Sequence, residues 1–218
     1  MNSAVIQLLV LAGIAIFLIL RLKNVLGTRE GFEKPPIAAP RRGATRGDFE
    51  VIEGGADRDI TDHAKEGSKE ANALNEMKAV EPEFNVSEFL NGARGAYEMI
   101  LMAFEHGKMD DIRPFLSDEV FETFAEVVAA REKQGLKIEA TFVGLREMSL
   151  VGAKFNKKTK IGDVSVKFIG EMTSVVRDKA GDIIEGNPSE IKRQKDIWTF
   201  GRKLGADDPN WQLVATGE

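Results

Sequence analysis

Few residues of this chain have the types and spacing that catalysis needs. There are two histidines, His63 and His106, and no cysteine, so thiol nucleophiles and cysteine-ligated zinc are excluded. The sequence has no His-x-x-x-His pair, Gly-rich phosphate loop or Gly-x-Ser-x-Gly motif. His63 lies in a charged stretch, and His106 precedes Gly107, where a polar side chain suits the end of a helix. We therefore expect no enzymatic activity, no metal and no cofactor.

The only tyrosine, Tyr97, is the strongest candidate for chemistry. It lies on the apolar side of a predicted helix, where an aromatic ring either packs in a core or lines a pocket. The acidic pairs at 110–111 and 207–208 and the basic run at 157–160 fall in predicted turns and are expected to be solvated. Nine further residues are candidates to line the same core or pocket: Phe89, Ala93, Ile100, Phe104, Phe121, Phe124, Trp198, Phe200 and Trp211.

Two helices and four strands must position these residues. Apolar side chains at helical spacing predict a helix over Ser87–His106 and a second between Ser117 and Gly135. Beyond Gly135 the apolar period changes to two, which predicts strands over about 138–150, 164–176, 191–202 and 211–215. Helices followed by a meander of strands indicate an α+β fold, with helices packed on a curved antiparallel sheet. The space between them is either a solid core or a cone-shaped pocket.

The N-terminus carries the clearest signal in the chain. Residues 4–20 read AVIQLLVLAGIAIFLIL, and a helix of this length spans about 26 Å, close to the ~30 Å core of a bilayer. Basic residues follow this segment rather than precede it, so we expect an uncleaved anchor with its N-terminus outside and the remainder in the cytoplasm. The residues assigned to this anchor are Ala4, Val5, Leu8, Leu9, Leu11, Ile14, Phe17, Leu18, Leu20 and Arg21.

Composition divides the chain into three predicted parts. Residues 1–27 form the anchor and its basic flank, 28–83 a flexible charged linker with a possible short helix at 65–79, and 84–218 a folded domain. The net charge of −5 argues against nucleic acid as the main partner, because phosphate binding needs a basic surface.

Three stretches of the predicted domain resemble one protein family. They are Phe89–Phe124, Ala129–Gly135 and Asp196–Thr216, and the last contains Trp-x-Phe-x-Arg, an acidic loop with proline, then Trp-x-Leu. Together they resemble the Tim44-like family, whose C-terminal domain has a fold like that of nuclear transport factor two. The resemblance implies an inner-membrane adaptor that tethers the Hsp70 import motor to a channel, with ribosome–membrane contact as a second use. With a predicted anchor and no presequence, the chain looks like the bacterial TimA-type branch.

The sequence therefore predicts a non-enzymatic adaptor anchored in a bacterial inner (plasma) membrane, with a cytoplasmic protein-binding domain that acts in translocation or membrane-protein biogenesis and quality control. Its expected partners are the lipid bilayer and a chaperone, translocase or ribosome-associated protein. Two alternatives stay open. One is an apolar-ligand-binding or enzymatic cone, which the aromatic content of the helices supports. The other is a secretion-system core component with a periplasmic domain, which needs basic residues before the anchor.

Overall fold

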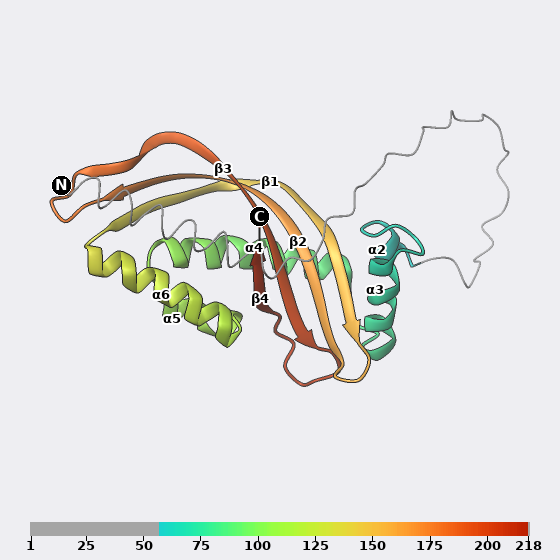
Figure 1. Ribbon diagram of the computed structural model, residues 1–218. Coiled ribbons are helices and arrows are strands. Elements are labelled where there is room, and N and C mark those ends of the chain that lie inside the picture. Colours follow the sequence, from blue (N-terminus) through green and yellow to red (C-terminus); the bar gives the residue numbers. More distant parts are fainter. Residues whose placement is uncertain (1–56, 218) are drawn as a thin grey trace, which may run out of the picture. The chain divides into compact units, whose positions relative to one another are not determined.

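A curved antiparallel sheet in the order β1-β2-β3-β4 is the centre of the computed structural model, which describes residues 57–217 (Figure 1). Its long strands are β1 (Lys137–Asn156), β2 (Ile161–Arg177) and β3 (Ile183–Lys203). The short β4 (Gln212–Gly217) pairs with residues 197–201 of β3, and its Leu213 also forms an isolated parallel bridge with Leu116. The predicted α+β class and the meander of strands are confirmed.

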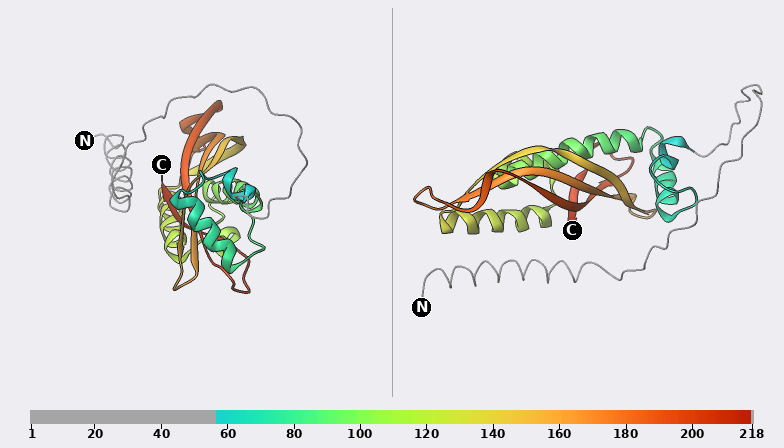
Figure 2. Two further views of the ribbon diagram at one scale, coloured as in Figure 1. Left: turned by 90° about the vertical axis from the view of Figure 1, so that its right-hand side faces the viewer. Right: turned by 90° about the horizontal axis from the view of Figure 1, so that it is seen from above.

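The two long helices lie on the concave side of this sheet (Figures 1 and 2). They are α4 (Val86–Glu105) and α6 (Asp118–Gln134), joined by the short α5 (Met109–Ile112) and the 3-10 turn η1 (Arg113–Phe115). Their ends follow local sequence rules. Side chains of Asn85 and Ser117 accept hydrogen bonds from the first turns, while Gly107 and Gly135 adopt left-handed φ values of 71° at the ends.

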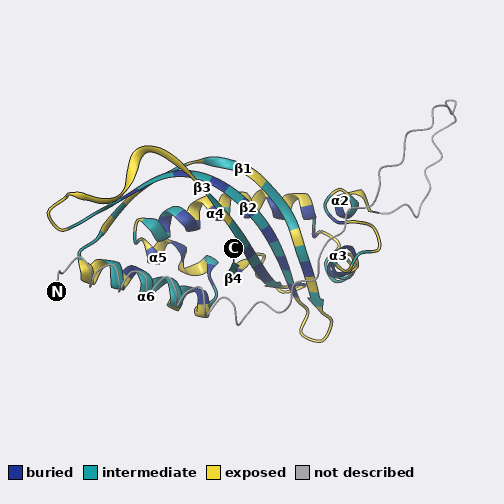
Figure 3. Ribbon diagram, turned by 45° about the horizontal axis from the view of Figure 1, so that its top comes forward, coloured by how far each residue is buried: buried dark blue, intermediate teal, exposed yellow. Residues whose placement is uncertain are grey.

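The core lies between the concave face of the sheet and α4. Along β2 every second residue from Val164 to Met172 is buried, while the residues between them are half-exposed. The register places Val166 between Leu150 of β1 and Trp198 of β3, so all three side chains lie on the same face. Figure 3 marks the buried residues of β2 in dark blue. The period-two pattern of the sequence therefore identifies the inner face.

Residues 57–83 depart from the expectation of a solvated linker. They form α2 (Arg58–Thr61) and α3 (Lys69–Val80), and Leu74 and Met77 of α3 are 0% exposed. Met77 packs at one end of the sheet, over Gly162. Only three of its twelve residues, Leu74, Met77 and Val80, have large apolar side chains, so the helical pattern over 65–79 is weak. Docking on the sheet is a long-range effect. The folded unit thus begins well before residue 84.

The predicted anchor at 4–20 lies outside the described residues. Within 57–217, no helix is both long and apolar enough to span a bilayer.

Candidate binding groove beside Trp211

Four aromatic rings meet where the N-terminus of α4 passes the end of β3. Phe89 of α4 lies 4.7 Å from Trp211 and 6.0 Å from Phe200, between ring centroids, in edge-to-face geometry. Phe84, just before α4, lies 5.7 Å from Trp211. Phe84, Phe89 and Phe200 are buried, whereas Trp211 is half-exposed. Only the Trp211 ring of this cluster is therefore partly open to solvent, and the three phenylalanine rings pack behind it.

A groove of about 370 Å³ opens over this cluster. One wall is the exposed side of α4, where a Cβ built on Gly92 would meet nothing within 4 Å. The other wall is the β3–β4 loop. The rim carries three carboxylates and one guanidinium, those of Glu81, Glu83, Glu88 and Arg202. The rest of the lining comes from Phe84, Asn85, Phe89, Ala93, Ala96, Phe115, Phe200, Pro209, Asn210 and Trp211.

Arg202 links the segment before α4 to the β3–β4 loop. Its guanidinium forms an ion pair with Glu81, donates a 3.0 Å hydrogen bond to the carbonyl oxygen of Pro209 and lies 5.2 Å from the centroid of the Trp211 ring. Glu81 also accepts a 2.9 Å hydrogen bond from the backbone N–H of Gly205. Burial raises the pKa of Glu81, but the Gly205 N–H and the Arg202 charge outweigh this effect and hold the pKa below its usual range. Glu81 is therefore ionised, and its carboxylate is already paired with the Arg202 guanidinium.

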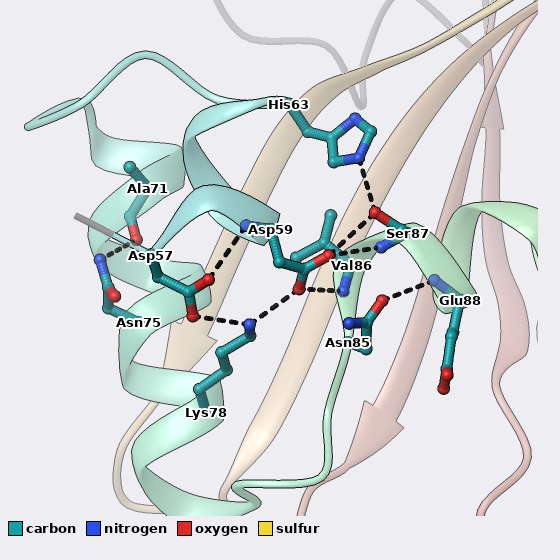
Figure 4. A network of polar contacts seen from close by, with 10 residues as sticks. All are labelled: Asp57, Asp59, His63, Ala71, Asn75, Lys78, Asn85, Val86, Ser87 and Glu88. Atoms are coloured by element: carbon teal, nitrogen blue, oxygen red, sulfur yellow. Dashed lines mark hydrogen bonds and ion pairs between the residues drawn. The ribbon is translucent and has the colours of Figure 1, made fainter. Parts of the chain in front are cut away.

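A second polar network fixes the start of α4 (Figure 4). The carboxylate of Asp59 accepts hydrogen bonds from the backbone N–H groups of Val86 and Ser87, at 2.7 and 3.0 Å, and from the Ser87 hydroxyl at 2.9 Å. Lys78 bridges Asp59 and Asp57 at 2.8 and 2.7 Å. Partial burial opposes ionisation of Asp59, yet Lys78 and these donors lower its pKa from 3.8 to about 2. A carboxylate from α2 thus stabilises the N-terminus of the groove helix.

Tyr97 is a core residue. Its ring is 0% exposed and stacks on Phe168, with centroids 4.4 Å apart. Its hydroxyl donates a 2.6 Å hydrogen bond to Asp196 of β3. Burial, together with the Asp196 carboxylate, raises the pKa of the tyrosine, so the hydroxyl stays protonated. The space beside this hydroxyl exists because residue 170 is glycine.

Comparison of the sequence with known proteins identifies its family. The profile of the Tim44-like domain matches residues 70–218. The chain belongs to the Tim44-like family. The match begins within α3, in agreement with a folded unit that includes this helix.

The similar curated proteins are distant relatives. Human mitochondrial import inner membrane translocase subunit TIM44 is 21% identical over 144 residues, which is 65% of this chain and 31% of the relative. Arabidopsis thaliana TIM44-1 is 22% identical over 162 residues, 72% of this chain and 34% of the relative. The chain therefore spans about a third of the length of the relatives it matches. A solved structure, the intermembrane space region of the chloroplast protein ARC6, aligns with 59% of this chain and 94% of its own at a TM-score of 0.40 and 12% identity.

The Tim44-like domain gathers only some of the predicted residues at its groove. Phe89, Ala93, Phe200 and Trp211 line it. Tyr97, Ile100 and Trp198 are buried in the core. Phe104, Phe121 and Phe124 are half-buried and pack against the core, away from the groove lining. The rings of Phe104 and Phe124 are 4.5 Å apart, and arginine side chains cover Phe104 and Phe121.

Sequence reasoning missed several groove residues, among them Glu81, Phe84 and Arg202. Glu81 lay in the predicted linker and Phe84 was the first residue of the predicted domain, so neither was expected to lie beside β3. One signal was available for Arg202, because it follows Trp198 and Phe200 at the period of two that marks one face of a strand. Among the described residues, no cluster of three or more His, Cys, Asp or Glu could hold a metal ion.

Proposed function

We propose that this chain is a non-enzymatic adaptor held at a membrane by its N-terminal segment, and that its Tim44-like domain binds a partner protein in the groove beside Trp211. The role would lie in protein translocation or in membrane-protein biogenesis and quality control. The relatives support this setting because they are named as subunits of an inner-membrane translocase. The groove is the observation that carries the proposal.

The chemistry of the groove favours a partner segment with an apolar side chain next to a lysine or arginine. Phe84 and Trp211 supply an aromatic floor of the kind found at protein interfaces. Glu83 and Glu88 are exposed at the rim, whereas Glu81 is paired with Arg202. The two exposed carboxylates would attract a cation and set the orientation of the bound segment. A volume of about 370 Å³ suits one or two side chains rather than a folded domain.

The groove can be blocked without disturbing its walls. We expect Gly92→Leu to fill it, because a side chain at this position enters open space. Gly95→Leu is a matched control: it lies on the same helix, also faces open space and is exposed. Neither change should destabilise the domain, since leucine favours helix by about 0.8 kcal/mol over glycine.

The test uses the full chain in its native membranes, with a photoreactive amino acid at Asn210. The wild type and Gly95→Leu should form the same adducts, and mass spectrometry should identify a chaperone, translocase or ribosome-associated protein among them. Gly92→Leu should reduce these adducts about tenfold. Equal adducts from both variants, or none from these protein classes, would contradict the proposal.

We further propose that the adaptor is a single-pass protein of a bacterial inner membrane, with its N-terminus outside and its domain in the cytoplasm. The order of charges around residues 4–20 supports this orientation. Alkaline phosphatase fused to the C-terminus should be inactive and a fluorescent protein fused there should be bright. An active phosphatase would instead favour a secretion-system component with a periplasmic domain.

A further inference from the structure

The sheet has an open edge at Lys192–Lys195 of β3. On one side this segment pairs with residues 169–172 of β2. On the other side β4 stops at Gly217, which is opposite Ile197, and no other strand within 57–217 pairs with this part of β3. In an antiparallel sheet, backbone N–H and C=O groups point alternately to either side, so this edge offers donors and acceptors to a further strand. Residues 188–191, which precede this segment in β3, have no paired residues in β2. The regular part of the open edge therefore begins at Lys192.

A hollow of about 560 Å³ lies beside this edge. Its lining includes Met172 and Ser174 of β2, Lys192 of β3 and Glu105 at the end of α4. Met172 is buried and lies opposite Lys192 in the register, so the hollow is on the concave face of the sheet. The carboxylate of Glu105 lies 3.9 Å from the guanidinium of Arg131, which leaves Glu105 only partly compensated. Glu105 and Lys192 thus give this face one charge of each sign, and an apolar side chain that enters the hollow can contact Met172.

The convex face of the same edge is positively charged. Arg193 and Lys195 alternate with Lys192 and Gln194 along the strand, so they lie on the convex face. Both are exposed, and the one described partner of Arg193 is Glu171 at 2.9 Å. Acidic side chains of an added strand would lie beside these cations, at cross-strand distances where opposite charges stabilise pairing.

We propose that Lys192–Lys195 binds an extended segment of a partner protein by strand addition, and that this segment alternates acidic with apolar residues. Its backbone would pair with the open edge, its apolar side chains would enter the hollow over Met172, and its acidic side chains would face Arg193 and Lys195. This site goes beyond the groove and has the opposite charge preference. Ten residues of strand separate Lys192 from Arg202, about 33 Å. An adaptor with both sites could hold two partners at once.

The test measures binding of a labelled acetyl-(Glu-Val)4-amide peptide to the full chain in neutral detergent micelles. We expect saturable binding by fluorescence anisotropy, and no binding of the matched Lys-Val peptide. The double variant R193E/K195E, which reverses both cations that face the acidic side chains, should weaken binding at least about tenfold. K65E/K69E is the matched control, since both lysines are exposed on the α2–α3 segment and the charge change is equal; it should bind like the wild type.

Two further measurements separate strand addition from simple charge attraction. Two further peptides are N-methylated at every Glu or at every Val, so each keeps all its charges but loses half of its backbone N–H donors. If the peptide pairs as a strand, at least one of the two must fail to bind. The proposal would be overturned if both methylated peptides bound as tightly as the unmethylated one, or if R193E/K195E bound the peptide as tightly as the wild type. Self-association of the chain that R193E/K195E abolishes would also overturn it, because the occupant would then be a second copy. Gly92→Leu should leave peptide binding unchanged, so failure here and failure of the groove proposal are distinguishable.

Discussion

At the scale of single residues, Gly170 makes the Tyr97–Asp196 hydrogen bond possible. A Cβ at position 170 would lie 2.8 Å from the Tyr97 hydroxyl and 3.2 Å from its ring. The ring cannot move away easily, because it stacks on Phe168 and is fully buried. We expect Gly170→Ala to lower the free energy of unfolding by about 1–3 kcal/mol through overpacking.

Chemical denaturation of Gly170→Ala and Gly144→Ala checks this expectation. Gly144 is a matched control because it is in β1, and a Cβ there would meet nothing within 4 Å. If the two variants were equally stable, the packing around Tyr97 would be looser than the structure indicates. A gain in stability on adding Tyr97→Phe to Gly170→Ala would identify the hydroxyl as the source of the clash.

At the scale of elements, Asp59 links α2 to the start of α4. The pKa of its carboxyl is lowered from 3.8 to about 2 in the folded protein, so its contribution is fully present above about pH 4 and is lost as the pH falls towards 2. Because the group is partly solvated, we expect about 1 kcal/mol from this charge. Asp59→Asn should therefore be less stable than the wild type at pH 7, and the difference should shrink by pH 2.

Unfolding by denaturant at pH 7, 4 and 2 measures this difference. Glu66→Gln is the control, because Glu66 is exposed on the α2–α3 segment and is outside the network. A difference between wild type and Asp59→Asn that stayed constant down to pH 2 would show that the charge of Asp59 does not stabilise α4.

The same two elements show how far sequence reasoning reaches. The ends of α4 and α6 were predicted within about a residue, because Asn85, Ser117 and the two C-terminal glycines act on backbone groups a few positions away. The role of Asp59 could not be predicted, since its hydrogen bonds to Val86 and Ser87 cross 27 and 28 residues. No local pattern distinguishes this aspartate from other acids of the charged stretch.

At the scale of the whole molecule, the α2–α3 segment is part of the folded unit. Ile60, Leu74 and Met77 are each at most 1% exposed, and burying such side chains contributes about 1.5–3 kcal/mol apiece. We expect a chain that starts at Phe84 to be less stable than one that starts at Gly54 by about 4 kcal/mol or more, or to be unfolded. Circular dichroism and urea titration of the two chains check this.

The shorter chain should also lose two of the three carboxylates at the groove rim, since Glu81 and Glu83 would be absent. Equal unfolding midpoints for the two chains would mean that α2 and α3 rest on the domain without stabilising it. In that case the stable folded unit would begin at residue 84, as the sequence analysis predicts.

The sequence by itself determined the two long helices, the four strands and the α+β class, because these depend on periodicity and on caps that act over a few residues. It also carried the resemblance to the family that the profile match established. Only the tertiary structure decided that α3 is docked, that Tyr97 is packed, and that the groove lies beside Trp211. The ion pair between Glu81 and Arg202 joins residues 121 positions apart. Such contacts depend on how the sheet curves and where α3 rests, and no local pattern encodes either.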